Sequence, residues 1–218
     1  MLVGHYGPAF ALKGAERTIP LWVLFVAVQW MDVLWSGFVA LGIERFRVVP
    51  GFTATNTFDL YYMPFTHSLP GAAALSLILG TIVAAFYRAN RVRVLTVVAL
   101  AVFSHWLIDL IVHVPDLALW DDSYKVGLGL WNYFWVALAL EFVFLIAGAW
   151  YYAQTVPSAR PRGDVALWSF VGFMMLLHVV VITMPAEPGS MLLVAVEAFT
   201  IYGILALLAA RVERLRRR

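Results

Sequence analysis

The sequence lacks cysteine entirely and is poor in charge. Only 13% of its 218 residues are Asp, Glu, Lys or Arg, whereas 63% are hydrophobic. A soluble globule of this length requires more polar surface, so the composition excludes an ordinary soluble protein and favours one embedded in a lipid bilayer. Without cysteine there are no disulfides or thiolate ligands, so nitrogen and oxygen atoms must provide any metal site.

The fingerprints of several enzyme classes are also missing. There is no G-x-S-x-G elbow, H-E-x-x-H helix, P-loop or Rossmann glycine pattern. Serine hydrolase, zincin, nucleotide-driven and dinucleotide chemistries therefore lack support. The first 14 residues have no basic residue before their apolar part and contain Gly and Pro, which does not fit a cleaved signal peptide. Nothing in the sequence indicates a nucleic-acid partner.

Six hydrophobic segments are separated by stretches that carry Pro, Gly or charge. A helical span needs about 20 apolar residues. We therefore predict an all-α polytopic membrane bundle of about six transmembrane helices in up-and-down order, preceded by a short N-terminal helix. Residues 1–218 would form a single integral membrane domain. The predicted spans are 18–43, 67–87, 92–113, 131–152, 165–184 and 190–211.

The basic residues are distributed unevenly over the predicted loops. Twelve of the fifteen Lys and Arg residues fall on one side, and only Arg45, Arg47 and Lys125 fall on the other. By the positive-inside rule the first side is cytoplasmic. We predict a multi-pass protein of the cell (inner) membrane with both termini in the cytoplasm. The basic tail at 211–218 fits a topology-fixing cluster better than a contact with anionic lipid.

A few ionisable residues lie inside these apolar segments. Such residues are costly in a bilayer, so they normally face the bundle interior, pair with each other and mark functional sites. At about 1.5 Å per residue, Asp32 and His105 lie about 21 Å from the cytoplasmic helix ends, and Asp109 about 27 Å. His67 opens the second span from the outer side. These four side chains therefore share the outer half of the membrane, within reach of one another if the first three spans are neighbours.

The third span reads FSHWLIDLIVHVPD, in which His105, Asp109 and His113 recur every four residues and share one helical face. One face of one helix can give two metal ligands, and Asp32 and His67 would provide others. The alternative is an interhelical hydrogen-bond network without metal. His113 fits a fourth ligand, a general acid that protonates a leaving group, or a solvated helix-end residue.

Four sequence blocks together resemble a known family. They are GHYGPAFALK at the N-terminus, QWMDVLW in the first span, PFTHS before the second span and SHWLIDLIVHVPDL in the third. Their combination is similar to that of the predicted inner-membrane metal-dependent hydrolases, which include a LexA-regulated member, and more distantly to zinc-dependent phospholipase C. The resemblance covers the first 120 residues, which would be the half with the metal site, and leaves 131–211 as accessory helices.

The resemblance implies a divalent metal, Zn first and Fe or Mn as alternatives. The implied ligands are His5, Asp32, His67, His105 and Asp109. The implied flanking residues are Thr66, Ser68 and Ser104.

This chain also departs from the family pattern. Members often read H-R-G-x-T-H-S, whereas Tyr62 stands here in place of the first His, with Asp59 three residues earlier. Asp59 is therefore a candidate replacement for a ligand or catalytic base, beside His113 as the other catalytic candidate. The acidic cluster often seen after the first Asp is absent, because Asp32 is followed by VLW. A single ion is thus favoured over a multi-metal centre.

His5 poses a topological problem, because residues 13–17 are predicted in the cytoplasm and the site in the outer half. A re-entrant segment at 1–12 could rise about 15 Å into the bundle and bring His5 to the site. The alternative is an amphipathic helix on the membrane surface, with His5 solvated. The resemblance favours a ligand.

Three further ionisable residues fit hydrogen-bonding or proton-relay roles better than metal ligation: Glu141, His178 and Glu197.

These features predict a membrane-embedded hydrolase that acts on a lipid or lipid-linked ester or phosphoester through a metal-activated water. Arg45 and Arg47 would attract an anionic headgroup, and Asp116 or Asp121 could complete the site. The alternative is an ion- or proton-coupled transporter that uses the same intramembrane residues. A di-iron oxidase usually needs more than the five histidines present.

Overall fold

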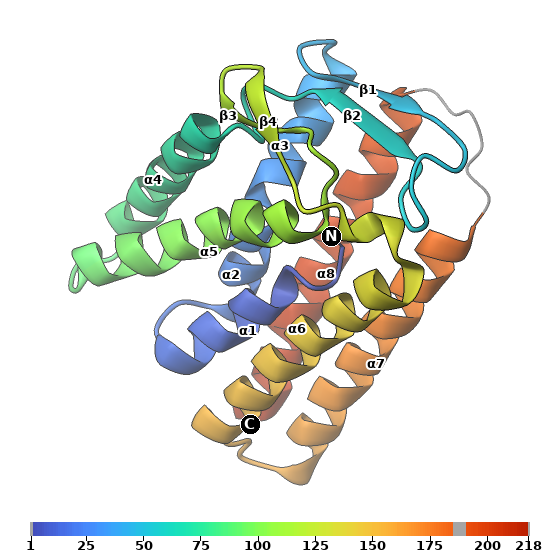
Figure 1. Cartoon of the computed structure of the whole chain (residues 1–218). Helices are drawn as coiled ribbons and strands as arrows, with labels where there is room; N and C mark the ends of the chain where they lie inside the picture. Colours follow the sequence, from blue (N-terminus) through green and yellow to red (C-terminus); the bar gives the residue numbers. More distant parts are fainter. Residues whose placement is uncertain (1, 185–190, 218) are drawn as a thin grey trace.

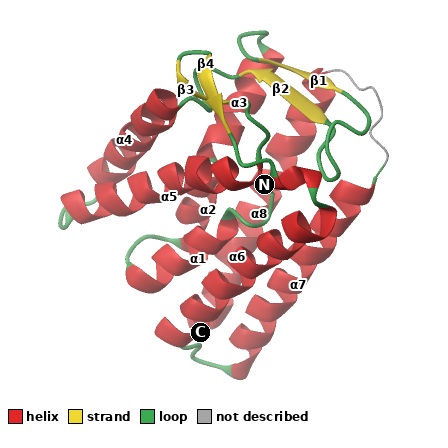
Figure 2. Ribbon diagram, viewed as in Figure 1, coloured by secondary structure: helices red, strands yellow, loops and turns green. Residues whose placement is uncertain are grey.

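The bundle consists of eight α-helices, a short 3₁₀ helix and two β-hairpins, in a computed structural model that describes residues 2–184 and 191–217 (Figures 1 and 2). The predicted all-α class is confirmed. The helices are α1 (Tyr6–Ala15), α2 (Leu21–Val28), α3 (Trp30–Ala40), α4 (Leu69–Ala85), α5 (Arg91–Val112), α6 (Phe134–Thr155), α7 (Pro161–Thr183) and α8 (Met191–Arg217), with η1 at Leu130–Asn132. The strands are β1 (Arg45–Val48), β2 (Phe58–Tyr62), β3 (Leu117–Trp120) and β4 (Ser123–Val126).

Fewer than six of the described helices are long and apolar enough to cross a bilayer. Of the described helices, α5, α6, α7 and α8 are each long and apolar enough to cross a bilayer, and α2 with α3 would be a fifth if the bent pair is one span. α4 has 17 residues and is about 26 Å long, short of a hydrocarbon core of about 30 Å. The predicted count of about six is therefore not confirmed. Position 190, where the sixth predicted span begins, lies outside the described residues.

The first predicted span is interrupted at Gln29. α2 and α3 are bent there by 52°, and the Gln29 amide bonds to the carbonyl of Val26, three residues back. The break leaves the carbonyl of Val28 to accept a hydrogen bond of 2.7 Å from Nδ1 of His105. The side chain of Gln29 also donates to the carbonyl of Leu2. The break thus places the end of α2 beside His105 and the side chain of Gln29 beside the N-terminal segment.

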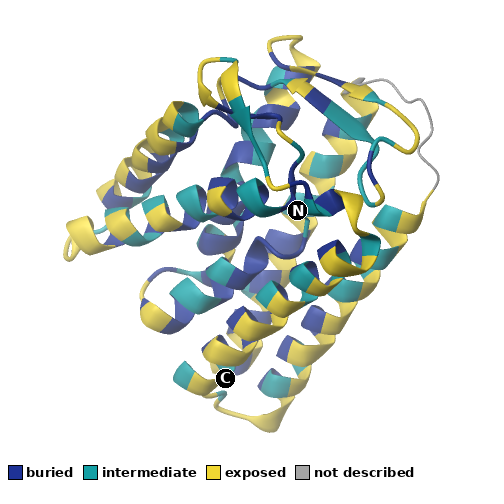
Figure 3. Cartoon of the chain, in the orientation of Figure 1, coloured by how far each residue is buried: buried dark blue, intermediate teal, exposed yellow. Residues whose placement is uncertain are grey.

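The N-terminal helix α1 lies inside the bundle, which agrees with the re-entrant alternative and not with a surface helix. α1 packs mainly against α6 and also contacts α2 and α5, and it is largely buried (Figures 1 and 3). The close approach to α6 depends on two glycines, because a Cβ added at Gly148 would meet the backbone of Gly7. Small residues of this kind let helix backbones approach closely in membrane bundles.

The two hairpins lie together at one end of the bundle, away from the C-terminus (Figures 1 and 2). The sequence predicts loops rather than strands at these positions. Both hairpins are antiparallel. The turn between β3 and β4 is formed by Asp121 and Asp122, and Asp121 adopts the left-handed conformation (φ 50°) that Asp tolerates better than most residues. Arg47 and Asp59 are cross-strand partners in the β1–β2 hairpin and form an ion pair.

The basic segments meet at the opposite end, as the charge distribution predicted. Arg93 at the start of α5 pairs with Glu16 after α1 (2.5 Å), and the carbonyl of Arg216 in α8 accepts a hydrogen bond from Ala159 in the α6–α7 loop. A hydrogen bond from the Thr18 hydroxyl lowers the pKa of Glu16, which keeps this carboxylate ionised beside Arg93. These contacts join α5 to the segment after α1, and α8 to the α6–α7 loop.

We predict that Gly148→Ala destabilises the protein by about 1–3 kcal/mol, because the new methyl group overlaps the backbone of Gly7. Thermal unfolding of the detergent-purified protein measures the effect. Gly172→Ala in α7 is the matched control, since a Cβ there meets nothing within 4 Å. Equal melting temperatures for the two variants would contradict the close contact of α1 with α6.

Candidate metal centre

The five residues implied as ligands converge on one buried cluster. Nε2 of His105 lies 3.0 Å from Oδ2 of Asp109 and 3.5 Å from Oδ1 of Asp32. Nε2 of His67 lies 3.3 Å from the same oxygen of Asp32. His5, directly before α1, places its Nε2 3.1 Å from Oδ1 of Asp109. The cluster joins the N-terminal segment, α3, the start of α4 and α5, as the sequence analysis expected.

Asp109 lies at the centre of this cluster. Its Oδ1 faces Nε2 of His5 and also Nε2 of His113, at 3.5 Å. Its Oδ2 faces His105 and, at 3.9 Å, His67. Four of the five histidines of the chain therefore surround one carboxylate that is 1% exposed. The spacing of four residues along α5 accounts for two of them, since His105 and His113 lie one turn on either side of Asp109.

The outer nitrogens of three histidines are fixed by hydrogen bonds. Nδ1 of His105 donates to the carbonyl of Val28, and Nδ1 of His113 lies 2.8 Å from a carboxylate oxygen of Asp116. Nδ1 of His67 lies 2.7 Å from the Thr66 hydroxyl. Metal-binding histidines usually bond in this way through the nitrogen that does not face the ion, to a carbonyl, carboxylate or similar group.

Glu44, a residue that no sequence motif singles out, fixes the direction of the hydrogen bond to His67. It is fully buried, and its carboxylate accepts hydrogen bonds from the amides of Phe65 and Thr66 and from the Thr66 hydroxyl (2.6 Å). Because the single hydroxyl proton of Thr66 is used on Glu44, Nδ1 of His67 must be the donor to Thr66. No spacing rule connects Glu44 with the Thr-His pair, since a hairpin separates them.

These hydrogen bonds determine which nitrogen faces the carboxylates. With Nδ1 protonated in His67, His105 and His113, a neutral ring carries its lone pair on Nε2. Each Nε2 then points a lone pair toward a carboxylate oxygen, an arrangement that requires a cation between them, either a metal ion or additional protons. Nε2 of His105 and of His5 makes no hydrogen bond among the described residues despite these short separations.

These donor groups could hold a metal ion. There are two groups of three residues in which each residue offers one ligand atom. Within each group, these atoms lie within 4.8 Å of one another. Imidazole nitrogens and carboxylate oxygens are ligands that suit Zn, Fe and Mn. The groups that could hold an ion are His5, His105 and Asp109, and Asp32, His67 and His105.

The segment that carries His5 is held by the far half of the chain. Glu141 of α6 is buried, and its two carboxylate oxygens accept hydrogen bonds from the amides of Leu2 (2.9 Å) and Gly4 (2.6 Å). The ring of His5 stacks on that of His105, with centroids 3.8 Å apart. The predicted hydrogen-bonding role of Glu141 is therefore observed, and this residue positions a backbone segment next to the cluster.

Several residues singled out in the sequence lie elsewhere. Asp59 is paired with Arg47 on the hairpin and does not line the cavity beside the cluster. Ser68 caps α4 by accepting from the Gly71 amide, and Ser104 bonds to a backbone carbonyl of its own helix. Of the three residues implied to flank the ligands, Thr66 alone contacts a cluster histidine in the described structure.

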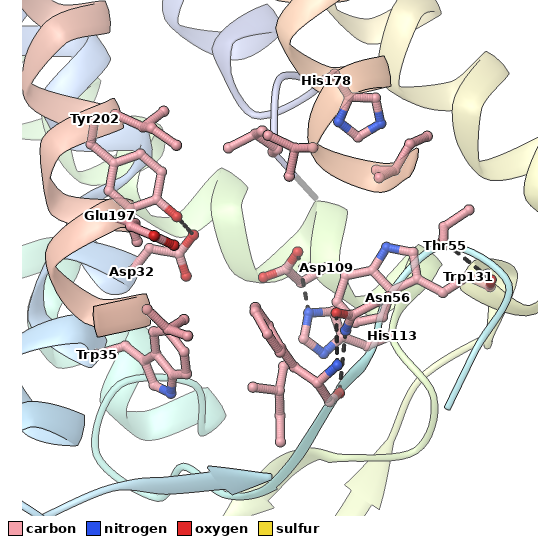
Figure 4. A pocket seen from close by; sticks show the side chains of 18 of the residues that line it. Asp32, Trp35, Thr55, Asn56, Asp109, His113, Trp131, His178, Glu197 and Tyr202 are labelled. Atoms are coloured by element: carbon pink, nitrogen blue, oxygen red, sulfur yellow. Dashed lines mark hydrogen bonds and ion pairs between the residues drawn. The ribbon is translucent and has the colours of Figure 1, made fainter. Parts of the chain in front are cut away.

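A cavity of about 250 Å³ adjoins the cluster (Figure 4). The polar part of its wall includes Asp32, His67, Asp109 and His113. Most of the remaining wall is apolar and comes from the β1–β2 hairpin, α7 and α8. Tyr202 of α8 points into it and donates a hydrogen bond of 2.9 Å to Oδ2 of Asp32. Nothing in the local sequence of α8 indicates this contact, which spans 170 positions.

Comparisons with protein families, with curated proteins and with solved structures find no match for this chain. The family resemblance therefore stays a prediction, and the geometry of the site has to carry the functional argument.

We predict that Glu141→Gln lowers metal affinity by about 10- to 100-fold. A glutamine amide can accept from one of the two amides of Leu2 and Gly4, but its NH₂ group faces the other, so the segment carrying His5 loosens. Metal titration followed by isothermal calorimetry measures the change. Glu197→Gln is the control, because Glu197 lines the same cavity from α8 but makes no hydrogen bond to the described N-terminal residues. Equal affinities for the two variants would refute this role.

Proposed function

We propose that this protein is a membrane-embedded, metal-dependent hydrolase. The observation that carries the proposal is the orientation of His67, His105 and His113, whose outer nitrogens are occupied as donors while their inner nitrogens face carboxylates. A plain interhelical network would use histidine protons to bond the carboxylates, with no need for three separate acceptors behind the rings. The donor set favours Zn, with Fe or Mn as alternatives.

In the proposed reaction, one set of residues would hold the ion and one histidine would provide a proton. The ion would be held by His5, Asp32, His67, His105 and Asp109. A bound ion of this kind supplies Lewis acidity and lowers the pKa of a water molecule. Asp109 faces Nε2 of His113 and Asp116 accepts from Nδ1, so these two carboxylates would stabilise the doubly protonated ring, which could deliver its Nε2 proton to a leaving group.

The substrate class follows from the cavity. Its wall is mainly apolar, and it is enclosed by helices apolar enough for a bilayer. These properties favour a lipid or lipid-linked ester or phosphoester over a water-soluble substrate. The same proposal places the hairpin end on the outer face of the cell membrane and the basic end, with both termini, in the cytoplasm, on the strength of the charge distribution.

A transporter remains the second candidate, because one feature favours it. Glu141, His178 and Glu197 line the same cavity beside the cluster, and Nε2 of His178 lies 3.8 Å from Glu141. A chain of ionisable groups at membrane depth is typical of proton relays. The structure ties Glu141 to the N-terminal backbone, which leaves it less free to exchange protons, and this argues for the hydrolase.

We predict that the purified protein contains zinc, iron or manganese in near-stoichiometric amount. His105→Ala combined with Asp109→Ala removes ligands from both groups of three and should empty the site. Elemental analysis by mass spectrometry measures the content. His178→Ala, which removes a buried histidine outside both groups, should leave the metal in place. A folded wild-type protein without bound metal would rule out the hydrolase.

We predict turnover of phospholipids or lipid phosphates that disappears when the metal is removed by chelation. His113→Ala should retain the metal and lower kcat by about 10²- to 10⁴-fold, because the variant lacks the proposed proton donor. Asp59→Ala should leave the rate near that of the wild type, since Asp59 lies on the hairpin outside the cavity. Metal-bound protein that moves ions across vesicles without any hydrolysis would favour the transporter.

A further inference from the structure

A second cavity lies at the opposite end of the bundle, near the C-terminus. Its volume is about 410 Å³, and it is enclosed by the end of α1, the α1–α2 and α6–α7 loops, and the ends of α6 and α8. The basic side chains that line it are Lys13, Arg17, Arg216 and Arg217, and the one acidic side chain in its lining is Glu213. Chain segments about 200 residues apart thus combine to form one basic pocket.

The positive charge of this pocket is only partly neutralised. Lys13 pairs with Glu213 at 2.7 Å and also donates to the carbonyls of Arg17 and Ile19, so its three donors are used. Arg216 pairs with Asp164 at 2.5 Å. Four cationic side chains therefore face two carboxylates among the described residues, and a net positive charge remains.

Unused hydrogen-bond donors accompany this charge. Arg216 is 2% exposed, its guanidinium lies over the ring of Tyr152, and its Nη2 donates to the carbonyl of Val156, yet its Nε–H has no partner in the described structure. A buried N–H without a partner is rare in folded proteins. Arg17 and Arg217 are exposed, and each uses one nitrogen, on the carbonyl of Thr155 and on Glu213 respectively. A guanidinium has five N–H donors, so several remain.

We propose that this pocket binds a phosphate group, either in the headgroup of an anionic lipid or in a soluble phosphate compound. Guanidinium groups match the oxygens of phosphate in charge and geometry, and three of them surround the pocket. Its place at the end of apolar helices, near the exposed aromatic rings of Trp150 and Tyr151, fits the headgroup layer of a bilayer. The site is independent of the metal centre and of the proposed hydrolase activity.

The test uses the full-length, detergent-purified protein with two probes. Native mass spectrometry counts the phosphatidylglycerol and phosphatidylcholine retained from mixed micelles, and calorimetric titration measures affinity for inorganic phosphate. The double variant Arg17→Gln with Arg217→Gln changes exposed side chains and should keep the fold. Loss of two basic groups should weaken binding by about 30-fold. Arg216→Lys keeps the charge but removes the Nε donor, and should weaken binding by a smaller factor.

The matched control is Arg91→Gln with Arg214→Gln, which removes two exposed charges at the same end but outside the pocket. It should change binding less than twofold. Loss of phosphatidylglycerol alone in the pocket variant identifies a lipid headgroup, and a parallel loss of inorganic phosphate identifies a general phosphate site. Equal losses in the pocket and control variants, or no preference for phosphatidylglycerol together with no phosphate binding, would overturn the proposal.

Discussion

A carboxylate at the centre of an apolar bundle has to be surrounded by partners, and the arrangement of this protein follows from how Asp109 meets that requirement. An isolated charge in such an environment costs many kcal/mol. Here four imidazoles from three parts of the chain approach its two oxygens. To bring them there, the N-terminal segment enters the bundle, the first apolar segment breaks at Gln29, and the chain before α4 turns inward. The departures from a simple up-and-down bundle are therefore concentrated around one group.

The groups behind the histidine rings determine which nitrogen of each ring faces the cluster. Val28, Thr66 with Glu44, and Asp116 each occupy the outer nitrogen of one histidine. Without them the rings could present either nitrogen and the cluster would be an ordinary polar network. With them, Nε2 of each of the three rings faces carboxylate oxygens, an arrangement that a metal ion or additional protons would stabilise. These groups turn a set of buried polar residues into a candidate metal centre.

Much of this was accessible from the sequence, and the reasons for success and failure differ. Helical spacing predicted the shared face of His105, Asp109 and His113, because periodicity along one helix is a local property. The known rise per residue of an apolar span also predicted that Asp32 and His67 lie within reach of His105 and Asp109, and the short separations agree with this. The break at Gln29 was missed because its polar partners come from distant segments.

Other features depend on contacts that no local pattern records. Glu44 reaches Thr66 across a hairpin, and Tyr202 reaches Asp32 across most of the chain. The hairpins themselves are short and lie in stretches whose charge suggested only loops. The predicted count of about six spans is not confirmed, because hydrophobicity alone does not reveal how short the helix α4 is. The hypothesis for Asp59 came from a motif position, and its ion pair with Arg47 keeps it on the surface hairpin.

The contact between Gly7 and Gly148 has a consequence for how the protein is made. Synthesis proceeds from the N-terminus, so α1 emerges long before α6 exists to receive it. The N-terminal segment can therefore reach its described position only after Glu141 and Gly148 have been synthesised. All five proposed ligands are encoded before residue 120, yet the position of His5 among them depends on contacts with the second half of the chain.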